Sequence, residues 1–275
     1  MKRMKVFLLA FAMCAVFFSC SDDDSDESNV SGTAAKGYVA NADVNVYAYL
    51  ETGARGKLLA STKTDAKGKY SVKVNHRGAA EVVVSNGTYK DEATGETVTI
   101  GSKHELRTVV ILNAEKEVAA VTALTTIAAA HVDAHASAGI ATAIANANAR
   151  VSTAFGLSGI NLTETIPSDF SYEAVTHSQA QVKYGIIQAG LSQVVKEQGL
   201  AAEKLLELIA DISADYSDDS FNNSKGSVAL QIALSVTPVQ AMTGLNVAIE
   251  NYMKGPNNHS GVASGSVSVT VPQPE

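Results

Sequence analysis

The hydrophobic pattern of this chain changes its period once, close to Asn113. Before that point apolar and polar residues alternate in short runs, and in ADVNVYAYL the residues that share one face are Val44, Val46, Ala48 and Leu50. Alternation with a period of two is typical of half-buried strands. After Asn113 the chain becomes rich in Ala, and apolar residues recur every three or four positions, as in amphipathic helices. This order predicts an α+β fold with strands first and helices second.

Turn sequences separate the short runs of residues 32–113. They are ANAD at 40–43, DAKG at 65–68, SNG at 85–87 and ATG at 93–95, and each supplies residues that favour turns. With the runs AEVVV and RTVVIL added, the segment holds about seven short strands, a spacing typical of an antiparallel β-sandwich.

The most specific motif of this segment is a predicted hairpin, TKTDAKGKY. Together with GYVANADVNVYAYL before it and AEVVVSNGTYKDEATG after it, the hairpin resembles the carboxypeptidase regulatory-like family, whose Thr-Asp-x-x-Gly-x-Tyr pattern matches Thr64, Asp65, Gly68 and Tyr70. The resemblance implies a transthyretin-like or Ig-like sandwich that has no active site of its own.

Residues 114–254 predict a separate domain, a bundle of helices. Three apolar stripes with helical spacing are Ile140, Ile144, Ala147, Val151 and Phe155, then Leu205, Leu208, Ile209 and Ile212, then Met242, Leu245, Ile249 and Tyr252.

Local signals predict where these helices begin and end. Asn113 is the expected N-cap of the first helix, with Glu115 and Glu117 in the first turn. Gly199 is the expected stop of a block over 172–198, and Thr237-Pro238-Val239-Gln240 is a capping box that starts the last helix. Residues 255–275 are expected to be a linker and a C-terminal strand or tail that docks on an edge of the sandwich.

The N-terminus predicts a lipoprotein signal peptide over residues 1–19. Basic residues precede an apolar run, Val6–Phe18, of about 13 residues, which is too short to span a bilayer but long enough for a signal peptide. Phe17-Phe18-Ser19-Cys20 resembles the bacterial lipobox, with Phe17 in place of the usual leucine. The resemblance implies that Cys20 becomes the first residue of the mature chain and carries acyl chains. The alternative is a plain signal peptide with an incidental cysteine.

Residues 20–31 combine the lipidated Cys20 with an acidic tether. Ser21, Asp22, Asp23 and Asp24 begin an acidic, apolar-poor run that cannot pack into a core. The run resembles the export signal of Bacteroidetes surface lipoproteins, which implies an outer-membrane protein facing the cell exterior. The alternative is a generic acidic spacer on a lipoprotein that faces the periplasm.

Charge and cysteine content exclude several classes of partner and site. The formal net charge is −7, and loss of the three cations of the signal peptide lowers it to about −10, which argues against nucleic-acid binding. Both cysteines, Cys14 and Cys20, lie in the targeting segment. The mature chain therefore has only Cys20, and disulfides, thiolate nucleophiles and Cys-ligated metals are excluded from its folded part.

Two histidines are the strongest metal candidates. His131 and His135 stand at i and i+4 on one helix face, while Asp133 is expected about 160 to 200° around the helix. Zinc proteases of the HExxH kind have Glu after the first His, where this chain has Val132. Surface or interhelical histidines are the ordinary interpretation, and a two-His zinc or nickel site completed by a distant carboxylate is the alternative.

Two acidic stretches are weaker candidates, for calcium. YKDEATGE contains Asp91, Glu92 and Glu96, and DISADYSDDSFNN contains Asp211, Asp215, Asp218 and Asp219. Neither has the EF-hand spacing with its central Gly, so solvated loop acids are expected in both.

No catalytic motif accompanies these candidates. GLSG at 156–159 and GLSQ at 190–193 miss the Gly-x-Ser-x-Gly pattern of a serine nucleophile. VTALTTIAAA, KYGIIQAGLSQV and ADISADYSDD resemble bacterial surface lipoproteins and adhesin modules. We therefore expect a non-enzymatic lipoprotein that needs no cofactor and binds a surface protein or glycan. The alternatives are a metal-assisted hydrolase and a periplasmic envelope structural lipoprotein.

Overall fold

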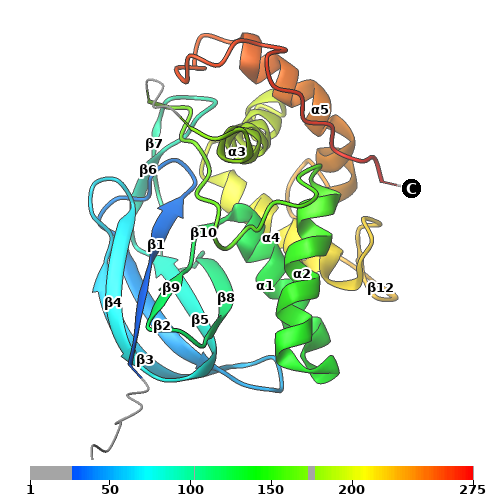
Figure 1. Cartoon of the computed structure of the whole chain (residues 1–275). Helices are drawn as coiled ribbons and strands as arrows, with labels where there is room; N and C mark the ends of the chain where they lie inside the picture. The colour runs from blue at the N-terminus through cyan, green and yellow to red at the C-terminus, as the bar shows by residue number, and fades with distance from the viewer. Residues whose placement is uncertain (1–26, 102, 173–176, 275) are drawn as a thin grey trace, which may run out of the picture.

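The strands come first in the chain and the helices follow, so the predicted α+β class is confirmed (Figure 1). The computed structural model describes residues 27–101, 103–172 and 177–274. Cys20 and the acidic run Ser21–Asp24 lie outside the described residues, and their predicted roles stay predictions. Among the described residues, no helix is long and apolar enough to cross a membrane.

One antiparallel sheet contains the runs in which apolar and polar residues alternate. Its order is β3-β2-β5-β8, made of β3 (Arg55–Lys63), β2 (Asp43–Tyr49), β5 (Gly78–Ser85) and β8 (Leu106–Leu112). In β2, Val44 and Val46 are fully buried and the residues between them are half-exposed. The predicted alternation is therefore confirmed from Val44 to Ala48, and it is wrong at the end of the run, where Tyr49 is buried and Leu50, beyond the strand, is 45% exposed.

A second sheet forms around β1. β1 (Glu27–Ala35) pairs antiparallel with β4 (Lys69–Asn75) and parallel with β9 (Lys116–Val118) and β10 (Val121–Thr122). A small hairpin joins β6 (Thr88–Lys90) to β7 (Thr97–Thr99). The sheet around β1 is therefore mixed and not purely antiparallel as predicted. Residues 27–31, which belong to the predicted tether over 20–31, form the start of β1, with Ser28 and Val30 fully buried, so the predicted end of the tether is wrong.

The predicted hairpin is wrong, because β3 and β4 pair in different sheets, and the four motif residues shape the turn that connects the two sheets. The Oδ1 atom of Asp65 accepts two backbone N–H groups of the turn, and Gly68 has a φ of 71°, which favours glycine. The Thr64 hydroxyl donates to the carbonyl of Val39 at 2.7 Å. The buried Tyr70 hydroxyl donates to a carbonyl in the segment that leads to the first helix.

The helical part follows from residue 123 onward. Its helices are α1 (Ala123–His135), α2 (Ile140–Ala154), α3 (Gln179–Glu197), α4 (Lys204–Asp215) and α5 (Pro238–Lys254), with the 3₁₀ turns η1 (Ala136–Ala138) and η2 (Tyr216–Asp218) and the short strands β11 (Ser224–Lys225) and β12 (Val228–Ala229). All residues of the three predicted apolar stripes are buried.

Two of the predicted helix ends are confirmed. Thr237 and Gln240 form the reciprocal capping box at the start of α5, with Pro238 in the first turn. Gly199, with a φ of 67°, follows the end of α3. This helix begins later than expected, at the capping box of Ser178.

The predicted start of the first helix at Asn113 is wrong. Residues 116–118 and 121–122 are strands on β1, and α1 begins after Thr122, whose side chain forms a capping box with Thr125. The carboxylate of Glu117 accepts the N–H of Asn113 at 3.0 Å. The segment extends along β1 because the edge of that strand offers backbone partners, which a local helix signal does not reveal.

Strands and helices share a buried core. Helix α1 packs against β8, and one cluster of buried apolar side chains runs from β1 to α5. The boundary at residues 113–114 between two separate domains therefore stays a prediction.

The C-terminal segment lies on helices. The side-chain amide of Asn246, on α5, accepts the N–H of Val271 at 2.8 Å and donates to its carbonyl at 2.9 Å. No strand forms between residues 255 and 274. The expected pairing of this segment with a sheet edge is wrong, because a helical Asn takes both backbone groups of Val271.

Candidate functional site

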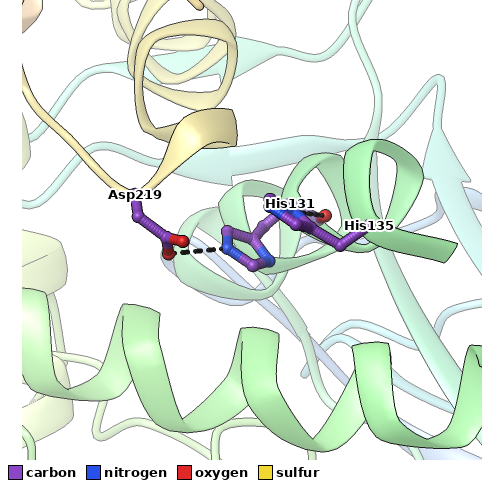
Figure 2. A group of neighbouring side chains, drawn as sticks. All are labelled: His131, His135 and Asp219. Carbon is purple, nitrogen blue, oxygen red and sulfur yellow. Dashed lines mark hydrogen bonds and ion pairs between the residues drawn. The ribbon is translucent and has the colours of Figure 1, made fainter. Parts of the chain in front are cut away.

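Three side chains with metal-ligand chemistry meet where α1 lies beside the turn that follows η2. Among the described residues, His131, His135 and Asp219 are the group of three whose ligand atoms all lie within 4.8 Å of one another. Figure 2 shows both histidines on α1 and Asp219 reaching them from the other segment. The predicted pairing of the two histidines on one helix face is confirmed, and the structure adds a carboxylate.

The two imidazoles are held by different partners. His131 is 2% exposed, and its Nε2 atom lies 2.8 Å from Oδ1 of Asp219. The His135 ring stacks on the His131 ring with a centroid distance of 4.1 Å. Nδ1 of His135 lies 2.9 Å from the carbonyl oxygen of His131. Because a carbonyl can only accept, Nδ1 of His135 carries the hydrogen when the ring is neutral, and its Nε2 has the lone pair.

The electrostatic surroundings keep His131 neutral. Burial lowers the pKa of His131, and the neighbouring His135 and Arg150 lower it further, against the opposing effect of Asp219. A guanidinium nitrogen of Arg150 lies 3.1 Å from Oδ1 of Asp219, and the Arg150 side chain is 53% exposed. A cation therefore already sits at the carboxylate, from the solvent side.

The backbone places Asp219 by ending η2 sharply. Asp219 has a φ of 73°, in the left-handed region that Asp tolerates better than most residues. Asp215 is fully buried and its Oδ1 accepts the N–H of Ser224 at 2.8 Å. Asp218 accepts the N–H of Gly226 at 2.6 Å. Of the four predicted acids, Asp215 and Asp218 thus shape the loop, Asp211 lies within α4, and Asp219 faces the histidines. The expectation of solvated acids is wrong for the buried Asp215.

Asp133 is directed away from this group, as expected. Its carboxylate pairs with Arg107 on β8 and accepts the hydroxyl of Tyr49 on β2. Arg107 also lies 2.8 Å from the buried Glu81. Asp133 therefore connects α1 to the sheet and contributes no ligand on the histidine face.

The acidic turn YKDEATGE differs from the expectation of solvated acids. Asp91 and Glu92 are 1% and 3% exposed. Glu92 forms an ion pair with Lys36, which is fully buried, and the Ser192 hydroxyl of α3 donates to Asp91 at 2.6 Å. The prediction of solvated acids is wrong for Asp91 and Glu92, because α3 covers this side of the turn and brings a polar side chain to it, whereas Glu96 is exposed as predicted.

Ser192 and Lys36 also have the residue types of a nucleophile and a base. Their Oγ and Nζ atoms lie 2.8 Å apart. Ser192 is 2% exposed, however, and both groups are surrounded by carboxylates in the interior. No substrate reaches this pair, and we assign it a structural role.

A cleft of about 620 Å³ lies between α2 and strands β8 and β9. Its apolar floor includes Ile144 and Ile160, and its polar lining includes Asn148, Asn161 and Glu164. The Oδ1 atom of Asn148 is buried and has no hydrogen-bond partner. A cleft of this size that is lined by both polar and apolar side chains can hold a ligand, although no sequence motif marks it.

Comparison with known proteins assigns neither a family nor a function to the chain. No protein-family model matches the chain, and no curated protein is significantly similar to it.

Proposed function

We propose that the protein is a lipid-anchored outer-membrane lipoprotein that faces the cell exterior and binds a surface protein or glycan without catalysis. The observation that carries the proposal is the distance from the proposed anchor to the fold. β1 begins at Glu27, seven residues after Cys20. Seven residues span at most about 25 Å when fully extended, so the start of β1 would stay close to the membrane.

This short tether would orient the molecule. The start of β1 lies at one end, and α3, α5 and the β6–β7 hairpin lie at the opposite end (Figure 1). The helices α3 and α5 would therefore face away from the membrane, toward a partner. The cleft between α2 and β8 would be reachable from the side, and its buried, unpartnered Asn148 oxygen is an acceptor for a hydroxyl or amide of a ligand.

The finer description of the fold belongs to the same proposal. We assign the two sheets to a sandwich of the carboxypeptidase regulatory-like type, on the basis of the turn between them that Thr64, Asp65, Gly68 and Tyr70 build. The resemblance supplies no catalytic residue, which favours a scaffold role for residues 32–113. Because one fold can carry many different functions, location and anchoring are the properties to test.

The experiment follows surface exposure in cells. An epitope is placed near Glu275, and protease shaving of intact cells is compared between the native chain and a variant with Asp22, Asp23 and Asp24 replaced by Ala. The proposal expects that only the native chain is shaved, and that both chains are cut once the outer membrane is opened. In addition, Cys20→Ala should abolish incorporation of labelled palmitate and release the protein from membranes.

Two outcomes would contradict the proposal. Protection of the native chain in intact cells would place it in the periplasm, as an envelope structural lipoprotein. If Cys20→Ala stays in the membrane and still incorporates palmitate, Cys20 is not the lipid anchor. As the matched control, Asp65, which shapes the turn between β3 and β4, is replaced by Asn, and shaving should be unchanged.

A further inference from the structure

We propose that His131, His135 and Asp219 form a binding site for a divalent first-row transition metal ion, with Zn²⁺ as its representative. The site is independent of the binding role proposed above, since it lies at the contact of α1 with the turn after η2. It rests on three observations: the convergence of the ligand atoms, the hydrogen bond that orients His135, and a nitrogen of His131 that has no partner.

The ligand atoms already lie at distances close to those of a metal site. Two atoms bound to the same Zn²⁺ at about 2.0 to 2.1 Å are about 3.3 Å apart in a tetrahedral site. One ligand atom from each of His131, His135 and Asp219 lies within 4.8 Å of the other two. Small side-chain rotations close the remaining gap, and the fold does not have to move.

His135 has the orientation of a metal ligand. Metal-binding histidines usually donate their other ring N–H to a carbonyl or carboxylate, which fixes the ring and the tautomer. The Nδ1 atom of His135 makes this hydrogen bond with the carbonyl of His131. Nε2 of His135 is therefore the nitrogen that can bind the ion.

His131 has one more ring nitrogen than it has partners. Its Nε2 atom is matched with Asp219, and its Nδ1 atom is buried without a hydrogen bond. Buried polar atoms without a partner are rare and require an explanation. Because Nε2 donates its hydrogen to Asp219, the lone pair of the neutral ring is on Nδ1, and a metal ion in the plane of the His131 ring would give this nitrogen a partner.

Arg150 would compete with a metal ion for Asp219. Its guanidinium lies 3.1 Å from the same Asp219 oxygen that faces His131. The side chain is largely exposed, and an exposed ion pair contributes at most about 1 kcal/mol. Arg150 can therefore swing into solvent when the ion arrives, and its presence should weaken metal binding.

The ligand set selects the class of metal. Ca²⁺ and Mg²⁺ prefer oxygen ligands, whereas imidazole suits Zn²⁺, Ni²⁺, Cu²⁺ and Co²⁺. Three protein ligands leave at least one position for water or for a ligand from a partner molecule. The site therefore has the open coordination of zinc sites that bind an exogenous ligand.

Calorimetric titration of the full chain, purified in detergent and freed of metal with a chelator, tests the proposal. We expect one equivalent of Zn²⁺ to bind, and Co²⁺ to give the visible absorption of a four- or five-coordinate site. His135→Gln and Asp219→Asn should each weaken binding at least tenfold. Arg150→Ala should tighten it several-fold. The exposed His259 provides the matched control, and His259→Gln should leave binding unchanged.

Circular dichroism of each variant separates loss of a ligand from loss of the fold. His135 is half-buried and Asn tolerates the backbone of residue 219, so both variants are expected to fold. Absence of saturable binding at one equivalent would overturn the proposal. Binding that persists unchanged in both folded variants would do the same, and unchanged affinity in Arg150→Ala would overturn the competition with the ion.

Discussion

Replacement of Lys36 by Met tests the buried contact between the strands and α3. The Lys36 ammonium is fully buried, pairs with Glu92, donates to Ser192 at 2.8 Å and lies 5.7 Å from the centre of the Tyr89 ring. Met fills a similar volume but leaves Glu92 as a buried carboxylate without a counter-charge. Removing one partner of a buried ion pair costs about 3 to 5 kcal/mol. Because domains are stable by only about 5 to 15 kcal/mol, Lys36→Met should lose a large part of the total.

The loss should depend on pH with a defined sign. Burial raises the pKa of Glu92, and Lys36 opposes this rise. A carboxyl group whose pKa is higher in the folded than in the unfolded chain stabilises the fold at low pH, and this contribution disappears as pH rises through the folded pKa. Without Lys36 the pKa of Glu92 rises further. The destabilisation by Lys36→Met should therefore be smaller at pH 5 than at pH 8.

Urea unfolding followed by circular dichroism and tyrosine fluorescence measures both effects, since the chain has no Trp. With a urea m-value of about 2 to 3 kcal/mol/M, the expected loss lowers the midpoint by about 1 to 2 M. The double variant Lys36→Met/Glu92→Gln should be more stable at pH 8 than Lys36→Met alone, because it has no buried charge without a partner. Lys63 and Asp43 form an exposed pair, so Lys63→Met is the matched control and should leave the unfolding midpoint nearly unchanged. A loss below 1 kcal/mol for Lys36→Met, or equal losses at both pH values, would refute the reasoning.

Two further substitutions test local structure by the same unfolding assay. Thr237→Ala removes the cap of α5 and should cost about 1 kcal/mol, whereas no loss would mean that the capping box contributes nothing in the intact protein. Gly68→Ala should cost more than the about 1 kcal/mol expected from a left-handed φ alone, because the added Cβ would lie 2.4 Å from the carbonyl oxygen of Ala34. Gly159→Ala is its control, with a φ of 83° and open space around the Cβ, and equal losses at the two positions would contradict the steric argument.

Local sequence signals predicted the parts of the fold that depend on neighbouring residues. The alternation of Val44 and Val46 sets the buried face of β2 whatever the strand pairs with, and the capping box of Thr237 is complete within four residues. The helix expected at Asn113 failed for the opposite reason. Its residues pair with β1, and the Ser28 hydroxyl bonds a carbonyl 86 positions away in the sequence. Long-range strand pairing of this kind leaves no periodic pattern in the short segment itself.

The same limit explains how much of the candidate site could be predicted. The spacing of His131 and His135 is a property of one helix, and it correctly placed the pair on one face and Asp133 on the other. The carboxylate comes from a turn 88 residues later in the chain than His131.

Within the stretch that supplies this carboxylate, residue type does not distinguish the acids. Asp215 and Asp218 bond backbone N–H groups of the following loop, and Asp219 faces the imidazoles because η2 ends in a left-handed residue. A stretch of acids that suggests one oxygen-rich site is therefore divided by backbone geometry into loop structure and a ligand. A site made only of carboxylates would prefer hard cations such as Ca²⁺. The proposed site, with two imidazoles and one carboxylate, prefers transition metals.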